Sequence, residues 1–290
     1  GCGEGGDIFG FVMKYEGVDF KESLKLLAGK AGVKLPEYKG KTAGEEEQLQ
    51  MLLRINAFAA RYYHEILMKS PTAETARAYV SSRGLTKETL EQWQIGYAPN
   101  DFHALEKALA GKQVNQFMLV TAGMSVKNES GNVYDRFRDR VSFPIFNYYG
   151  EVVGFSARVL KNDDAAAKYI NSPETDIYHK SKILFGLNFA KQEIRKRDAV
   201  VIVEGQMDCI KAHQAGFANT VATSGTALAE DHLSILGRLT KNLFFCFDGD
   251  KAGLTAARRA GALALSAGFK IKMVVLEGAK DPDELISKDP

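Results

Sequence analysis

The spacing of apolar residues predicts helices in the first third of the chain. Intervals of four, three and four predict a helix with one apolar face, formed by Phe20, Leu24, Leu27 and Ala31. A longer helix is predicted to begin with an acidic first turn at 45–47. Its apolar stripe consists of Leu52, Ile55, Phe58, Tyr62 and Ile66. A further amphipathic pair of helices is predicted on either side of Arg83-Gly84-Leu85, and Thr86 suits the N-cap of the second. The polar stretch 36–44 between the first two helices, rich in Gly and Lys, indicates a linker.

The pattern changes after Arg140. Two apolar runs, 141–146 and 152–160, predict strands joined by a hairpin at 148–150. In the last ninety residues, continuous apolar runs alternate with helical patterns. The predicted strands are 199–203, 220–222, 243–247 and 271–276, and the predicted helices between them are 207–215, 228–239 and 253–267. This alternation indicates a Rossmann-like parallel sheet covered on both faces.

Composition allows one large or two modest globular domains. The chain has 290 residues, of which 45% are hydrophobic, and no run approaches the roughly 18 apolar residues of a membrane span. No secretory signal is visible at the start. The three cysteines, Cys2, Cys209 and Cys246, are scattered, which favours a reducing compartment over a disulfide framework. Because the chain starts without Met and stops at Asp289-Pro290, we expect it to be part of a longer protein.

Charge is unevenly distributed although the net charge is only +2. Residues 134–197 contain 12 Lys/Arg and 8 Asp/Glu, with three cations together at 195–197. Residues 200–290 contain 10 Lys/Arg and 11 Asp/Glu. A basic block followed by an acidic block is compatible with a polyanion track beside a metal site, although uneven charge alone is common in proteins.

Acidic residues follow three of the four predicted parallel strands. They are Glu204 and Asp208 after the first strand, Asp248 and Asp250 after the third, and Asp281 and Asp283 after the fourth. The carboxyl ends of parallel strands meet at one edge of a sheet, where ligands bind. Carboxylates gathered there repel one another unless divalent cations lie between them, and an oxygen-only ligand set favours Mg²⁺ or Mn²⁺ over zinc. The alternative is that these residues are solvated loop acids and helix caps.

Longer motifs around these acids resemble those of the Toprim fold, which bacterial primases, topoisomerases and some nucleases share. The motifs are V-E-G-x-M-D at 203–208, S-G-T-A at 224–227, F-D-G-D-x-A-G at 247–253 and K-D-P-D-E at 280–284. In this long form they most resemble bacterial DNA primases of the DnaG type. The resemblance implies two-metal nucleotidyl transfer, with Glu204, Asp248 and Asp250 as catalytic residues and all six acids at the Mg²⁺ or Mn²⁺ site. Whether Glu204 is a ligand or a general base stays open. Gln206 departs from the pattern, because many relatives carry an aromatic residue there.

Two stretches of the basic block also resemble primases. They are D-R-F-R-D-R at 135–140, continued by G-F-S-A-R at 154–158, and K-Y-I-N-S-P-E-T at 168–175. The resemblance assigns DNA and nucleotide binding to Arg136, Arg138, Arg158, Lys168, Tyr169, Asn171 and Lys180. Such cations pair with phosphates, and Tyr169 offers a face on which a base can stack. The alternatives are that the alternating arginines form a solvent face and that Tyr169 packs in a core.

The segment around Cys2 resembles the end of a primase zinc ribbon. Tetrahedral zinc needs four ligands, and the partners of Cys2 would precede residue 1. We therefore expect Zn²⁺ only in the full-length protein and treat Cys2 here as an incomplete site. The five histidines lack paired ligand spacing and receive no metal role.

The predicted architecture is a Toprim α/β domain preceded by a mixed α/β primase subdomain. The predicted boundaries are 1–35 for the ribbon remnant, 36–48 for the linker, 49–195 for the basic subdomain and 196–290 for the Toprim domain. The resemblance implies synthesis of RNA primers by a cytoplasmic monomer, from ribonucleoside triphosphates on single-stranded DNA. It also implies a replicative helicase as partner through a missing C-terminal domain. The alternatives are a topoisomerase or nuclease with the same acids, and a non-catalytic DNA-binding module, which would have lost them.

Overall fold

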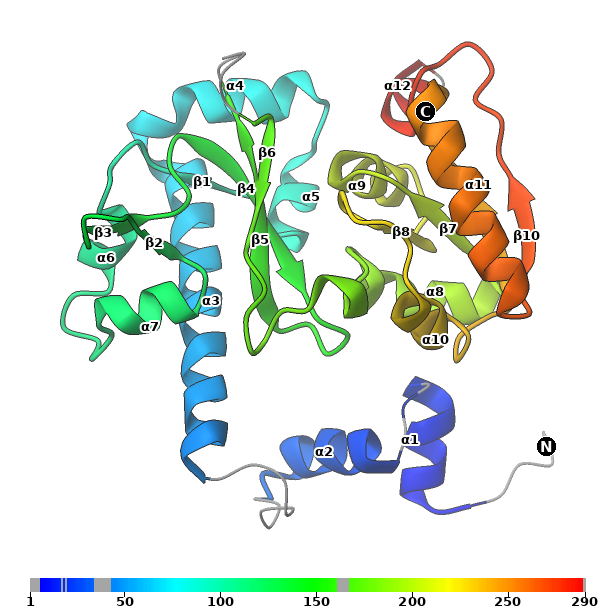
Figure 1. Cartoon of the computed structure of the whole chain (residues 1–290), viewed down its shortest axis with the longest axis horizontal. Helices are drawn as coiled ribbons and strands as arrows, with labels where there is room; N and C mark the ends of the chain where they lie inside the picture. Colours follow the sequence, from blue (N-terminus) through cyan, green and yellow to red (C-terminus); the bar gives the residue numbers. More distant parts are fainter. Residues whose placement is uncertain (1–5, 17, 19, 34–42, 161–166, 289–290) are drawn as a thin grey trace.

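Two α/β units and an N-terminal pair of helices make up the computed structural model, which describes residues 6–16, 18, 20–33, 43–160 and 167–288. The pair consists of α1 (Ile8–Glu16) and α2 (Phe20–Ala31), drawn in dark blue in Figure 1. Cys2 and most of the predicted linker lie outside the described residues. The end of that linker was predicted wrongly, because residues 43–48 form the first turns of α3 (Ala43–Lys69).

The first unit is built on an antiparallel sheet. Its strand order is β1 (Gly96–Ala98), β4 (Arg140–Phe146), β5 (Val152–Val159) and β6 (Tyr169–Asn171). The predicted hairpin is confirmed as β4 and β5, which are fully buried over most of their length. Helix α3 packs on this sheet, and Figure 1 shows its N-terminal half extending below it.

Short elements surround that sheet. They are η1 (Pro71–Ala73), α4 (Glu74–Ser82), α5 (Lys87–Gln92), α6 (Ala104–Ala108), α7 (Gln116–Thr121), the hairpin of β2 (Ser125–Lys127) and β3 (Val133–Asp135), and η2 (Lys180–Lys182). The predicted cap of α5 is confirmed, since the Thr86 hydroxyl accepts a hydrogen bond from the amide of Thr89. Most of the other short elements have no periodic signal in the sequence.

The second unit contains the predicted parallel sheet. Its order is β10 (Lys270–Met273), β9 (Asn242–Phe245), β7 (Val200–Val203) and β8 (Thr220–Ala222), with parallel neighbours throughout. Its helices are α8 (Leu187–Arg197), α9 (Gln206–Gln214), α10 (Glu230–Leu236), α11 (Lys251–Ser266) and α12 (Pro282–Lys288). The fourth strand differs from its predicted form, because it is a short, largely exposed edge strand rather than a buried one.

Alternating side chains of β7 cover the two faces of this sheet differently. Ile202 belongs to a core cluster with residues of α8, α10 and α11, whereas Val203 belongs to a cluster with α9 and the first unit. The prediction that both faces are covered is therefore confirmed. It also follows that the expected boundary at 195/196 falls inside α8, whose Ile194 packs in the core of the second unit.

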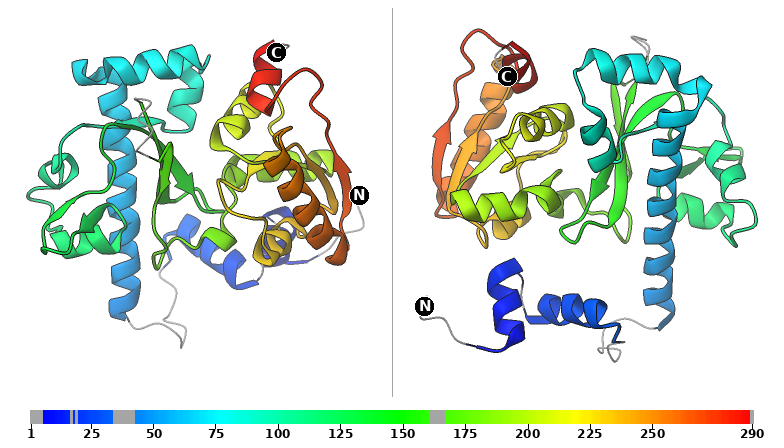
Figure 2. Two further views of the ribbon diagram at one scale, coloured as in Figure 1. Left: turned by 45° about the horizontal axis from the view of Figure 1, so that its top comes forward. Right: turned by 180° about the vertical axis from the view of Figure 1, so that it is seen from behind.

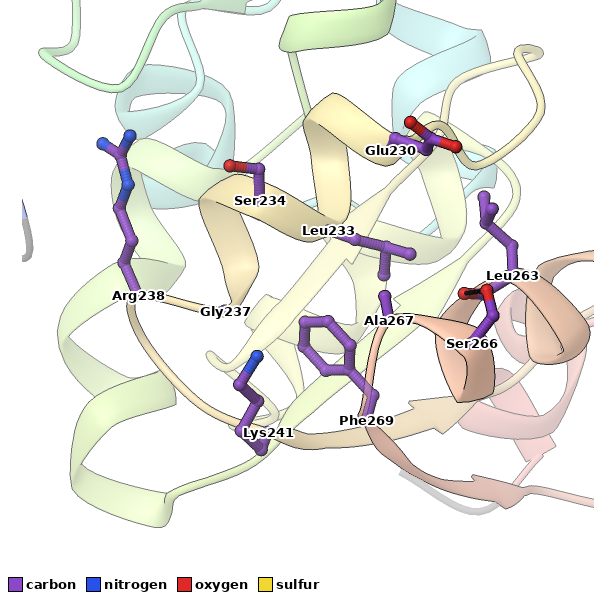
Figure 3. A pocket seen from close by; sticks show the side chains of 10 residues that line it. All are labelled: Glu230, Leu233, Ser234, Gly237, Arg238, Lys241, Leu263, Ser266, Ala267 and Phe269. Atoms are coloured by element: carbon purple, nitrogen blue, oxygen red, sulfur yellow. Dashed lines mark hydrogen bonds between the residues drawn. The ribbon is translucent and has the colours of Figure 1, made fainter.

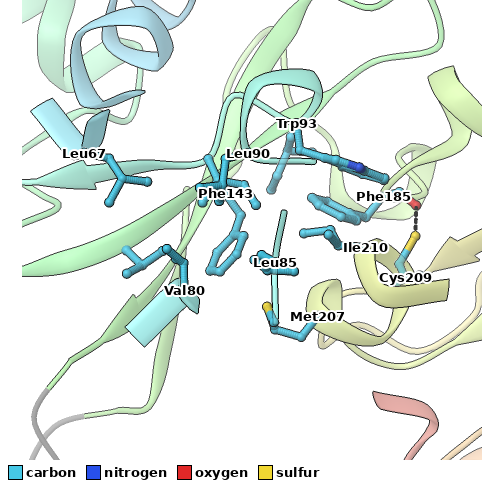
Figure 4. Close-up of a cluster of buried hydrophobic side chains, with 14 of the residues drawn as sticks. Leu67, Val80, Leu85, Leu90, Trp93, Phe143, Phe185, Met207, Cys209 and Ile210 are labelled. Atoms are coloured by element: carbon cyan, nitrogen blue, oxygen red, sulfur yellow. Dashed lines mark hydrogen bonds between the residues drawn. The ribbon is translucent and has the colours of Figure 1, made fainter. Parts of the chain in front are cut away.

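The two units share a hydrophobic interface. The Trp93 ring stacks on Phe185 with centroids 5.2 Å apart, and both contribute to the cluster that contains Ile210 of α9 and Phe143 of β4 (Figure 4). Figure 2 shows the units side by side in two further views. The N-terminal helices contact this assembly as well, since Lys191 Nζ lies 3.2 Å from Glu16 Oε2. None of the described helices has the length and apolar character required to cross a membrane.

Candidate nucleotidyl-transfer site

The strand-end acids lie where the sheet topology predicts. Glu204 follows β7, and Asp248 follows β9, which is hydrogen-bonded to β7 in parallel. The amide of Asp248 donates a hydrogen bond of 3.1 Å to Glu204 Oε1, so these two acids are neighbours. Asp248 Oδ1 is buried and has no hydrogen-bond partner among the described residues, as expected for an oxygen that a ligand completes.

Glycine at position 253 permits this approach. A Cβ there would lie 2.9 Å from Glu204 Oε1 and 2.2 Å from the carbonyl oxygen of Asp248. Any larger residue would force α11 away from the two acids. The D-G-D-x-A-G motif contained this signal, but only the structure explains it.

Three of the acids also cap helices, as the alternative interpretation expected. Asp208 Oδ2 accepts the amide of Gly205 at 3.2 Å, at the start of α9. Asp250 Oδ1 accepts the amide of Gly253 at 2.8 Å, at the start of α11, and Asp281 Oδ1 accepts the amide of Glu284 at 2.7 Å, in α12. Capping occupies one oxygen of Asp250 and one of Asp281, so the two interpretations are compatible.

Asp283 is engaged differently. Its carboxylate forms an ion pair with Arg83 of the first unit, and its amide donates to Asp208 Oδ1 at 3.3 Å. Asp208 therefore has both oxygens occupied by backbone amides, and Asp283 is turned toward Arg83. Both were predicted at the metal site, and that role stays a prediction; in this structure their carboxylates are engaged by backbone amides and by Arg83.

The acids share a strongly negative environment. Burial, followed by the charges of Asp248 and Asp281, raises the pKa of Asp208 to about 7. Burial, followed by the charges of Glu204, Asp281 and Asp250, raises the pKa of Asp248 to about 6. Bound cations would relieve this repulsion, so the donor set fits Mg²⁺ or Mn²⁺. In the described part of the chain, however, no three His, Cys, Asp or Glu side chains are already arranged around one point.

The predicted basic residue Arg136 is linked to this site through the backbone. Its Nε and Nη2 donate to the carbonyl oxygen of Asn171 at 3.2 and 3.1 Å. Asn171 Nδ2 donates to the carbonyl oxygen of Ser224 at 3.3 Å, and the amide of Ser224 donates to the carbonyl oxygen of Glu204 at 2.9 Å. Four residues thus connect the basic sheet to the acidic strand end across the two units.

Aromatic rings hold two other predicted arginines. The Arg138 guanidinium lies 4.6 Å from the ring centre of Phe102 and 4.8 Å from that of Tyr134. Arg158 lies over the ring of Tyr79 at 4.3 Å. Phe102 was not predicted from the sequence; it is 57% exposed, and no local pattern singles it out.

The remaining predicted residues, Lys168, Tyr169 and Lys180, have different surroundings. The positive charge of Lys168 favours the ionised form of Asp248 and so lowers its pKa, against the larger raising effects of burial and the neighbouring acids. Tyr169 packs against the core, with its ring centre 6.4 Å from that of Phe143, and burial raises its pKa. This packing favours the alternative role in a core over base stacking. No hydrogen bond or ion pair between described residues joins Lys180 to the acids, and His232 Nε2 lies 2.9 Å from its carbonyl oxygen.

The opposite edge of the parallel sheet has a pocket of another character. Its volume is about 620 Å³, and it lies between α10 and α11 near the starts of β9 and β10. Figure 3 shows Lys241 beside the Phe269 ring, with Leu233 and Leu263 nearby. Glu230 is the only acid among the described residues that line it, so this pocket does not resemble the strand-end site.

Three family descriptions match successive parts of the chain. Residues 62–191 match the N-terminal domain of the DNA primase catalytic core, residues 201–286 match a Toprim-like domain, and residues 1–43 match the CHC2 zinc finger. The class defined by the fold and the acidic strand ends is therefore that of Toprim proteins.

Similar proteins narrow the assignment within the class of Toprim proteins. The chain is 39% identical over 289 residues to a DNA primase of Halalkalibacterium halodurans, which covers 99% of this chain and 48% of that protein. It is 40% identical to a DNA primase of Clostridium acetobutylicum, with 100% of this chain and 48% of that protein covered. The chain thus spans about half the length of the curated relatives that it matches.

Solved structures agree with these relatives. A DnaG primase catalytic domain bound to single-stranded DNA is 40% identical, with a TM-score of 0.76 over 84% of this chain and 79% of that one. The zinc-binding and RNA polymerase domains of Aquifex aeolicus primase are 33% identical, with a TM-score of 0.77 over 100% of this chain and 69% of that one. The chain belongs to the bacterial DNA primase family.

Proposed function

We propose that this chain is the RNA-polymerising part of a DNA primase, which joins ribonucleotides on a single-stranded DNA template. The observation that carries the proposal is the pair of Glu204 and Asp248, with a buried, unpartnered Asp248 oxygen, connected through Ser224 and Asn171 to a surface of arginines. A template-directed polymerase needs both parts, a carboxylate site and a polyanion track.

Asp248, Asp250, Asp281 and Glu204 are the residues proposed to hold Mg²⁺ or Mn²⁺. Such cations, when bound, lower the pKa of an attacking hydroxyl and stabilise a departing pyrophosphate. Asp208 and Asp283 support this set from behind, because their carboxylates accept backbone amides and the Arg83 guanidinium. Asp248 needs to be ionised, and Lys168 favours that state.

The chain's own cations account for substrate binding in this proposal. Lys168 would contact the triphosphate of the incoming ribonucleotide, since it lies beside the acids. Arg138 with Phe102 offers charge and an exposed aromatic ring, a combination suited to the phosphates and bases of single strands. A relative that is 40% identical has been solved with single-stranded DNA, which supports the same template here.

We further infer that the chain functions within a longer protein. Zinc would be bound by Cys2 together with residues outside this chain, and a replicative helicase would bind outside it as well. We place the division between the two units before α8, because Leu187, Ala190 and Ile194 pack in the second core.

A gel assay with labelled ribonucleotides and single-stranded DNA tests the proposal. We expect short RNA products with Mg²⁺ or Mn²⁺, none with EDTA, and none from the Asp248→Asn variant. A topoisomerase or nuclease would instead cleave or relax DNA with the same acids. Cleavage without incorporation, by the full-length protein, would overturn the proposal.

A further inference from the structure

A second pocket lies at the junction of the two units, beside the acidic site. Its volume is about 680 Å³, within the range of roughly 300–1,000 Å³ that small-molecule sites occupy. The turn after α4 contributes Ser82 and Arg83 to its wall, α9 contributes Lys211, and the segment at the start of α12 contributes Lys280 and Asp281. The pocket is thus formed only when both units are in contact.

Lys211 is the unusual member of this wall. It is 7% exposed, and in the described part of the chain its ammonium group makes no hydrogen bond or ion pair. The ammonium lies under the turn at Gly84, since a Cβ on that glycine would be 3.2 Å from Lys211 Nζ. The stem of Lys211 is buried, whereas its ammonium end borders the pocket and is available to an anion bound there.

The acids of the pocket do not serve as a counter-charge for Lys211. Asp283 pairs with Arg83, and Glu284 has its Oε1 2.9 Å from Lys288 Nζ while its Oε2 accepts the amide of Lys280. Asp281 caps α12 through one oxygen. After these pairings, two lysine charges, those of Lys211 and Lys280, face the single carboxylate of Asp281. The lining thus holds three cations and three carboxylates, and among the described residues none of these carboxylates forms an ion pair with Lys211 or Lys280.

We propose that this pocket binds a small phosphate-bearing anion. Lys211, Lys280 and the N–H groups of Arg83 that do not contact Asp283 are the donors. None of the described residues that line the pocket is aromatic, so the ligand is recognised by its phosphates rather than by a base. Pyrophosphate, the product that nucleotidyl transfer releases, is the source we expect. That choice of source rests on the proposed function, whereas the anion site itself does not.

Calorimetric titration of the full-length protein with inorganic pyrophosphate tests the site. EDTA is present so that no divalent cation can carry the anion to the strand-end acids. We expect Lys211→Met, which keeps most of the apolar stem, to weaken binding at least about tenfold, the effect of about 1.4 kcal/mol. Lys69→Met, at an exposed lysine of α3, should leave binding unchanged. Absence of binding by the parent protein, or equal binding by Lys211→Met, would overturn the proposal.

Two further variants keep the test decisive if Lys211→Met unfolds. Ser82→Glu leaves Lys211 intact and adds a carboxylate to the exposed wall, so it should weaken binding while the circular dichroism melt stays unchanged. Equal binding by Ser82→Glu counts against the site. Lys168→Met instead removes a charge that acts on the strand-end acid Asp248. If this variant alone abolishes binding, the anion binds at the strand-end acids and the proposal fails.

Competing anions distinguish the source of the ligand. Inorganic phosphate should compete weakly, and a nucleoside diphosphate should bind no more tightly than pyrophosphate. Tighter binding of the nucleoside diphosphate would overturn pyrophosphate as the ligand. The titration needs no polymerase activity, so a protein that makes no primers can still confirm or refute this pocket.

Discussion

The Arg83 guanidinium, in the turn after α4, forms an ion pair with the carboxylate of Asp283 in α12, 200 residues further along the chain. Asp283 in turn donates its amide to Asp208 of α9. A residue of the first unit thus fixes two of the acidic motifs of the second. The acidic site is consequently a property of the assembled chain rather than of the parallel sheet alone.

Arg83→Ala should destabilise the protein. The Asp283 side chain is only 7% exposed, so its charge would be left buried and unpaired, whereas Arg83 is 36% exposed and partly screened by water. We expect the free energy of unfolding in urea at pH 7 to fall by about 1–3 kcal/mol. The double variant with Asp283→Asn should recover part of that loss, because the unpaired charge is gone. Equal destabilisation of the single and double variants would contradict this account.

The acids should differ in their effect on metal binding. Asp248 has a buried oxygen without a partner, whereas Asp283 is engaged by Arg83. We expect Asp248→Asn to abolish Mn²⁺ binding in titration calorimetry and Asp283→Asn to weaken it less. Circular dichroism melts serve as the control for folding. If binding is unchanged in Asp248→Asn and Asp250→Asn alike, the metal site is elsewhere.

Single-stranded DNA binding should depend steeply on salt. If Arg136, Arg138 and Lys168 contact phosphates, each Ala variant should lower the slope of log affinity against log salt by about 1. Arg138→Lys should keep the slope but bind more weakly, because lysine lacks the planar guanidinium that contacts the rings of Phe102 and Tyr134. Fluorescence anisotropy over a salt series measures both effects. Parental slopes in all three Ala variants would mean that these cations face solvent.

Asp135 should make stability depend on pH. It is 1% exposed, burial raises its pKa to about 6, and its Oδ2 accepts the amide of Leu105 at 2.7 Å. Because this pKa lies above the ordinary value of 3.8, the folded state holds the proton more tightly. The contribution of Asp135 to stability is therefore lost as pH rises from about 4 to about 6.

Asp135→Asn removes that titration and keeps an oxygen for the amide of Leu105. Relative to the parent, the variant should gain about 1–3 kcal/mol of unfolding free energy between pH 4 and pH 7. Asp208 and Asp248, whose pKa values are also raised, titrate in both proteins. Their contributions to the unfolding free energy therefore cancel in the difference between variant and parent. Urea titrations of both proteins at pH 4 and pH 7 measure this difference in unfolding free energy. A constant difference between the two proteins would show that Asp135 does not titrate in this range.

Local patterns were sufficient to predict the elements with strong periodicity. The apolar spacing from Phe20 to Ala31 matches α2 at both ends, and the run 220–222 matches β8. The order of these elements also implied a parallel sheet, and hence that Glu204 and Asp248 meet at one edge. The resemblance to primases added the identity of the acids, which periodicity alone does not give.

Long-range contacts account for what the sequence did not reveal. Asp135 holds the amide of Leu105, 30 residues away, and nothing local predicts that α6 starts there. Arg83 was noted only as part of a turn, because its partner Asp283 is remote. The fourth strand was predicted as buried from its apolar residues, but its edge position exposes Met273. In each case the structure depends on a residue or strand that lies on another element of the chain.

The last prediction concerns Lys168 and Lys180, which the resemblance assigns together to the nucleotide. Their surroundings differ, since Lys168 acts electrostatically on Asp248 whereas the backbone of Lys180 lies within hydrogen-bond distance of His232 and Glu174. Lys168→Ala should raise the KM for ribonucleotides, and it should also raise the pKa of Asp248, shifting the acid limb of the pH–rate profile upward.

Lys180→Ala should raise the KM for ribonucleotides with a smaller shift of that limb, because a charge that lowers the pKa of Asp248 comes from Lys168. Both variants should bind single-stranded DNA nearly as well as the parent, which anisotropy measures separately. Steady-state primer synthesis from pH 5.5 to pH 8.5 gives the KM and the profile in one series. Identical profiles in the two variants would show that Lys168 does not favour the ionised state of Asp248. A DNA-binding defect as large as the KM defect in Lys180→Ala would instead place Lys180 on the template.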